Sequence, residues 1–87
     1  MKILLEKLQK LERMEEIANH AEADYDREPE NAKYEETFDL AYQNEFNAYI
    51  EAAKYIEYMT SGNIDFITAK KMIRTKRAEL ISILSAQ

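Results

Sequence analysis

Hydrophobic residues recur every three or four positions along most of the chain, in three stretches separated by two short breaks. This spacing is that of one face of an α-helix, and one glycine and one proline leave room for few turns. We therefore expect an all-α fold with helices at about residues 2–27, 30–60 and 65–85, in one domain over residues 1–87. The two short connections favour an up-down-up three-helix bundle with a long central helix.

The predicted central helix has an unusually wide apolar face, formed by two neighbouring stripes of side chains. At helical spacing, one stripe holds Tyr34, Phe38, Ala41, Ala48, Ala52, Tyr55 and Met59. The other stripe holds Tyr42, Phe46, Tyr49, Ala53 and Ile56. Because a helix with two neighbours needs about twice the apolar arc of an edge helix, we expect this helix at the centre of the bundle.

Each outer stretch presents one principal apolar stripe. In the first stretch it consists of Leu4, Leu8, Leu11, Met14, Ala18, Ala21 and Tyr25. In the last stretch it consists of Phe66, Ala69, Ile73, Leu80 and Leu84. The leucines of the first stretch either cover the central helix or meet a second chain, so a homodimer is one expectation.

The residues at the two breaks predict how the helices begin and end. Proline suits the first turn of a helix, so we expect Pro29 in the first turn of the central helix. At the second break, Gly62 is suited to the left-handed conformation that closes a helix. Asn63 or Asp65 is then expected to cap the next helix.

Composition limits the class of protein further. With 46% hydrophobic and 33% charged residues, arranged periodically, the 87-residue chain is typical of a folded helical domain. It has no cysteine, which excludes a disulfide scaffold and fits a cytoplasmic location. No stretch is predicted to span a membrane, and the opening residues lack the apolar core of a secretory signal.

The net charge of −5 is unevenly distributed. Residues 1–27 carry five basic and seven acidic side chains, residues 28–63 two and eight, and residues 64–87 five and two. Either the basic final segment balances the acidic body internally, or one charged face meets a partner.

The sequence contains little that resembles a catalytic or metal site. We find no phosphate-binding glycine loop, no HExxH and no nucleophile motif, so we expect no enzyme activity, cofactor or metal. His20 lies four residues after Glu16, whereas the di-iron carboxylate pattern places Glu and His three apart. Glu45 falls within the central apolar stripe, so we expect it to be partly buried, and either paired with Lys76 or Arg77 or extended to reach water.

Surface tyrosines and carboxylates provide the leading hypothesis, a small acidic protein-binding module that inhibits or regulates a larger partner. The six tyrosines exceed what a small core holds, and Tyr55 and Tyr58 are expected on different faces, with at least one exposed. The acidic surface is predicted to include Glu28, Glu35, Glu36 and Asp39. Phages and mobile elements often encode small acidic helical proteins, and such a surface is able to imitate the charge of nucleic acid.

The alternative hypothesis is a nucleic-acid-associated regulator that uses the basic residues of the last helix. Lys70, Arg74 and Arg77 are predicted to form one exposed row, with Lys71 beside it. A row of cations along a helix is suited to contacts with phosphates. The acidic balance of the whole chain favours the protein-binding module over this alternative.

Overall fold

The computed structural model describes residues 2–86, apart from the side chain of Ile83. It confirms an all-α fold, whereas a three-helix bundle around a long central helix is not confirmed. None of the described helices is long and apolar enough to cross a membrane. The helices are α1 (Lys2–Arg27), α2 (Ala32–Met59), α3 (Phe66–Thr75) and α4 (Arg77–Ser85).

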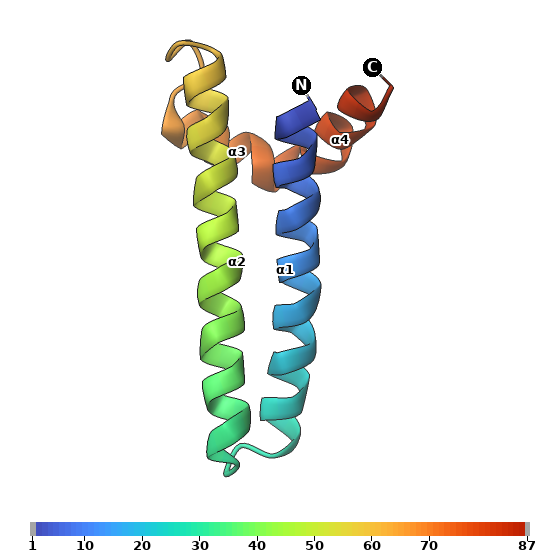
Figure 1. The fold of residues 1–87 in the computed structure, drawn as a ribbon, viewed down its shortest axis with the longest axis vertical. Helices are drawn as coiled ribbons and strands as arrows, with labels where there is room; N and C mark the ends of the chain where they lie inside the picture. The colour runs from blue at the N-terminus through green and yellow to red at the C-terminus, as the bar shows by residue number, and fades with distance from the viewer. Residues whose placement is uncertain (1, 87) are drawn as a thin grey trace.

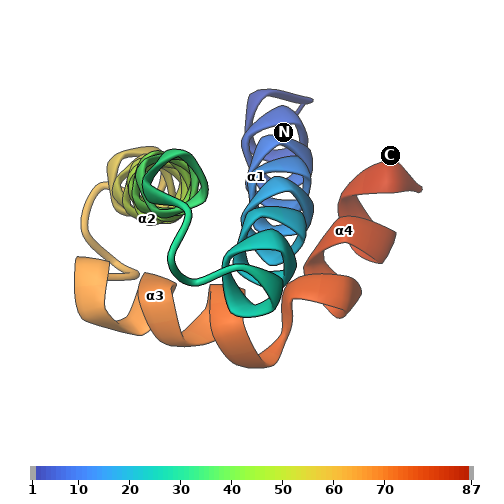
Figure 2. The same cartoon turned by 90° about the horizontal axis from the view of Figure 1, so that it is seen from below.

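The two long helices form an antiparallel hairpin, and the two short helices cover only part of it (Figure 1). α3 crosses the hairpin near the end that holds the N-terminus, and α4 lies beside α1 (Figures 1 and 2). α3 packs against α2, while α4 packs against α1. We call the side of the hairpin on which α3 lies the α3 face. Close to the α1–α2 connection this face carries no third helix.

The predicted third helix is broken at Lys76, whose φ of −131° and ψ of 20° lie outside the helical range. Continuing the stripe of Ala69 and Ile73 would turn Lys76 and Arg77 toward the apolar core, where their charges would be desolvated. The break instead lets α4 change direction and bury Leu84. Because α3 already crosses the hairpin, the bend adds a second change of direction, and the last segment does not run along the whole hairpin.

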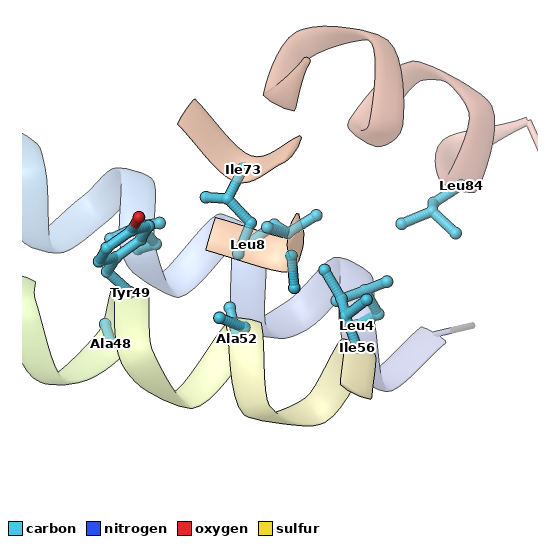
Figure 3. Packing of buried hydrophobic residues seen from close by; sticks show 11 residues of the cluster. Leu4, Leu8, Ala48, Tyr49, Ala52, Ile56, Ile73 and Leu84 are labelled. Carbon is cyan, nitrogen blue, oxygen red and sulfur yellow. The ribbon is translucent and has the colours of Figure 1, made fainter. Parts of the chain in front are cut away.

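The main core lies where all four helices meet (Figure 3). Leu8, Leu11 and Ile73 have almost no exposed surface, and the alanines of α2 let the neighbouring helices approach closely. A smaller cluster of Ala18, Ala21 and Ala41 joins α1 to α2 near their connection. The core is thus concentrated at one end of a molecule that measures 46 × 24 × 19 Å.

The first connection differs from the prediction. α2 begins at Ala32, so Pro29 lies in the turn before the helix and outside its first turn. Asn31 caps the helix, since its side-chain Oδ1 accepts a hydrogen bond of 3.0 Å from the backbone N–H of Lys33. An asparagine at the cap satisfies an otherwise unpaired N–H, which is why the helix starts there.

The second connection largely follows the prediction. Gly62 has a left-handed φ of 83°, but Ser61 is left-handed as well, with a φ of 51°. The N–H of Gly62 donates to the carbonyl of Glu57 and that of Ser61 to the carbonyl of Tyr58, which is a Schellman closure. Asp65 then caps α3, and the hydrogen bond from the backbone N–H of Thr68 lowers the pKa of its carboxyl.

Candidate protein-binding surface

The predicted acidic residues lie at the connection end of the hairpin. Glu28, Glu35, Glu36 and Asp39 are all exposed, and none takes part in an ion pair within the part of the chain that the structure describes. We call residues 12–46, the half of the hairpin that includes this end, the turn half. It carries twelve carboxylates and three lysines or arginines, whereas the rest of the chain carries five and nine.

Tyr55 and Tyr58 lie near the opposite end of α2 from the predicted acidic residues. Asp39 and Tyr58 are separated by roughly 28 Å along the helix, at a rise of about 1.5 Å per residue. Tyr58 is 80% exposed, whereas Tyr55 is half-buried beneath the ammonium group of Lys7. The six residues predicted as one partner-binding set therefore do not form a single site.

The prediction that Tyr55 and Tyr58 share no face is wrong. Their ring centroids are 6.3 Å apart, since side chains three positions apart on a helix are neighbours. The expectation that at least one of the two is exposed is confirmed by Tyr58.

A groove that the sequence pattern did not predict lies on the α3 face, where α3 and α4 meet the turn half. Its cavity measures about 340 Å³. It is lined by Leu11, Glu15, Tyr42, Glu45, Phe46, Tyr49, Arg74 and Arg77. Tyr42 is 59% exposed and Phe46 is 50% exposed, because the crossing α3 covers α2 at Tyr49 and leaves the turn of helix before it bare.

The carboxylates of the groove repel one another. Burial raises the pKa of Glu45, the negative charges of Glu15 and Glu22 raise it further, and the charge of Arg77 opposes the shift. The expected partial burial of Glu45 is confirmed. Its expected partner is wrong, because Arg77 pairs with Glu15 and no ion pair within residues 2–86 includes Glu45.

The predicted basic row is only partly available to a partner. Arg74 lies over the ring of Tyr49, and its Nε donates a hydrogen bond of 2.9 Å to the tyrosine Oη. Lys70 lies 4.9 Å from the ring centroid of Phe66 and is half-buried. Arg77 is also half-buried, so the prediction of a fully exposed row is wrong for Lys70 and Arg77. Lys71 and Arg74 are exposed as expected.

Metal-ligating groups do not gather in the described part of the chain. Residues 2–86 contain no group of three or more His, Cys, Asp or Glu side chains suited to a metal ion. His20 is exposed on α1, as is Glu16 one turn before it.

No protein-family model, no curated protein and no solved structure matches this chain. The features that bear on its function are therefore the shape, charge and exposed side chains of its own surface. These features define an all-helical molecule with an acidic half and an aromatic groove beside it.

Proposed function

We propose that this chain is a non-enzymatic protein-binding module that inhibits or regulates a larger partner through its acidic turn half. One observation carries the proposal, namely the separation of charge along the molecule. The turn half has twelve carboxylates against three basic side chains. Within residues 2–86 the ion pairs of the turn half are those of Asp24 with Arg27 and Glu15 with Arg77, so few of the described carboxylates there are neutralised internally.

The partner that suits this surface is a protein with a basic groove or patch. A dense set of exposed carboxylates steers such a partner during encounter and disfavours acidic competitors. A protein that normally binds nucleic acid offers a groove of this kind, in which case the turn half imitates the charge of the phosphates. The molecule then acts by occupying the groove.

The test is affinity capture from a nuclease-treated extract at moderate salt, with the bound protein quantified. The Glu36→Gln, Asp39→Asn double variant removes two exposed carboxylates of the turn half. The matched control, Glu6→Gln with Glu79→Gln, removes two exposed carboxylates from the other half. We expect the first variant to retain about 5- to 30-fold less partner and the control to behave as wild type.

Two results would contradict the proposal. One is unchanged retention by the turn-half variant, and the other is an equal loss in both variants. Circular dichroism checks that each variant remains helical, so that weaker capture reports on the surface and not on unfolding.

Nucleic-acid binding through α3 is the second candidate. The observation that favours it is the opposite charge of the α3–α4 end, where Lys71 is exposed. It receives less support because Arg74 and Arg77 are engaged with Tyr49 and Glu15. Retention of DNA or RNA at low salt that falls steeply with added salt and with Lys71→Gln would favour this candidate, whereas no retention would eliminate it.

A further inference from the structure

The α3 face has a step in it. On one part of this face α3 stands out from the hairpin, while α4 lies beside α1, and on the turn half none of the described helices covers the face (Figures 1 and 2). A helix with its side chains is about 10 Å thick, so the step is deep enough to receive one further helix. The groove beside Arg74 and Phe46 lies at the foot of this step.

The two levels of the step are complementary in chemistry. The outer surface of α3 exposes Ile67, at 68%, together with Lys71. The bare level exposes Tyr42 and Phe46 in an acidic region that includes Glu45. An apolar and basic ridge and an aromatic and acidic recess therefore lie on one face of the same molecule.

From this arrangement we propose that the α3 face is a homodimer interface, in which two antiparallel copies each place α3 in the other's bare turn half. The two copies are related by a two-fold rotation about an axis parallel to α3. This rotation reverses the direction of one hairpin relative to the other and turns the two α3 faces toward each other. Each ridge then meets a recess, so the contact is closed and isologous.

The direction of α3 places the complementary groups opposite one another. α3 begins beside α2 and ends beside α1 (Figure 2). A rotation axis parallel to α3 keeps the order of α2 and α1 along that axis. Ile67, near the start of α3, therefore lies against α2 of the second copy, the helix that carries Tyr42 and Phe46. Lys71, one turn further on, approaches the carboxylates that line the groove of the second copy.

The size of the α3 face leaves room for a stable dimer. Its outline, set by the 46 and 24 Å axes of the molecule, is large enough to contain the roughly 800 Å² per subunit that a stable interface buries. Two chains of charge −5 repel each other overall. The antiparallel arrangement offsets this repulsion, because the acidic half of each copy lies against the basic α3 of the other.

The first experiment is sedimentation equilibrium of the purified chain over a range of concentrations. We expect a monomer–dimer equilibrium that Phe46→Glu shifts at least tenfold toward monomer. The control is Leu40→Glu, at a position of similar exposure, 60% against 50%, that points away from the α3 face. A wild-type chain that stays monomeric at its highest soluble concentration overturns the proposal, as does an equal effect of both variants.

The second experiment tests the arrangement of the two copies. The chain has no cysteine, so single cysteines report without background. One mixture combines the Ile67→Cys and Phe46→Cys variants under mild oxidation, and the control mixture combines Ile67→Cys with Leu40→Cys. We expect the mixed disulfide to accumulate faster in the first mixture. Equal cross-linking in the two mixtures overturns the antiparallel arrangement.

This inference and the proposed function fail separately. Dimerisation is measured on the pure protein, whereas the proposed function is measured by capture of a partner that depends on Glu36 and Asp39. If wild type is monomeric and Phe46→Glu abolishes capture of the partner, the groove binds another protein. This result refutes the dimer but is compatible with the proposed binding module.

Discussion

At the scale of single residues, two leucines show how strongly the effect of a substitution depends on its surroundings. Leu8 is 0% exposed and belongs to the core where the four helices meet, whereas Leu40 is 60% exposed on α2. We expect Leu8→Ala to lower the free energy of unfolding by about 2–5 kcal/mol, through lost burial and the cavity left behind. Leu40→Ala is expected to change it by less than about 0.5 kcal/mol.

Urea unfolding followed by circular dichroism measures both leucine variants. If Leu8→Ala lowers the free energy of unfolding by less than about 1 kcal/mol, close to the effect of a surface substitution, this core is not the main source of stability.

The carboxyl of Glu45 makes stability depend on pH. Burial raises its pKa in the folded chain above the ordinary 4.5, so the folded state binds the proton more tightly than the unfolded state does. Wild type therefore loses stability as the pH rises through the raised pKa, and Glu45→Gln does not. At pH 7 we expect Glu45→Gln to be the more stable chain, by up to about 1 kcal/mol, with the difference vanishing below the ordinary pKa.

Glu51 provides the control of opposite sign for Glu45. The hydrogen bond from Lys7 lowers the pKa of Glu51 in the folded chain, so its stabilising effect is present above pH 4.5 and is lost as the pH falls through the lowered pKa. Glu51→Gln should thus reduce stability at neutral pH, by a few tenths of a kcal/mol because the pair is exposed. Urea unfolding from pH 3 to pH 8 measures the stability of both variants. If Glu45→Gln and Glu51→Gln changed stability at pH 7 in the same direction, the opposite pKa shifts of the two carboxyls would be contradicted.

Residue burial was predictable where it depends on one seam between two helices. Leu4, Leu8, Leu11 and Ala18 follow helical spacing and are buried as expected. The exposure of Phe46 was not predictable, because it depends on how far the last segment reaches along α2. Helical periodicity identifies an apolar face but does not say how much of its length a neighbour covers.

At the scale of secondary-structure elements, the joint between α3 and α4 decides the shape of the molecule. Arg77 holds this joint in two ways, since it pairs with Glu15 of α1 and its Nε donates to the carbonyl of Ile73 at the end of α3. A double-mutant cycle with Glu15→Gln and Arg77→Gln isolates the ion pair. We expect a coupling energy of about 1 kcal/mol, because both side chains are partly buried.

Two results from this cycle bear on the joint. Arg77→Gln should also speed amide hydrogen exchange in α4 more than in α1, since it releases the joint and leaves the hairpin intact. A coupling energy near zero would assign the stability of the joint to the packing of Leu84 and not to the ion pair.

The ends of the elements were better predicted than their packing. Gly62 is left-handed and Asp65 caps α3 as expected, because closure and capping depend on the local chain alone, although Ser61 is the first left-handed residue after the helix. The start of α2 was misplaced because Asn31 offers a stronger cap than a helix beginning at Pro29. The break at Lys76 was missed because it arises from contacts of α3 and α4 with two different helices.

At the scale of the whole molecule, folding makes the separation of acidic and basic residues stronger in space than it is along the sequence. The end of α1 and the start of α2 are each acidic, and the hairpin brings them side by side, far from the basic residues of α3. The sequence therefore indicated an acidic body and a basic final segment. It did not indicate that the acidic half has only two helices to hold it together.

This distribution predicts how stability depends on salt. Carboxylates in the turn half repel one another over distances comparable with the screening length, which is about 30 Å at 0.01 M salt and 3 Å at 1 M. At low salt we expect Glu36→Gln with Asp39→Asn to be more stable than wild type by about 0.5–1 kcal/mol, and high salt to remove the difference. Glu51→Gln, which removes the partner of Lys7 and Lys10, should instead be less stable than wild type at low salt.

Thermal unfolding at several salt concentrations measures this effect, and amide hydrogen exchange locates it. Exchange in the turn half of wild type should slow as salt is added, because screening relieves repulsion where few ion pairs oppose it. If salt instead destabilised wild type and the double variant alike, attraction between the two ends of the molecule would outweigh repulsion within the acidic half. The turn half would then be too well compensated to act as the proposed contact surface for a basic partner.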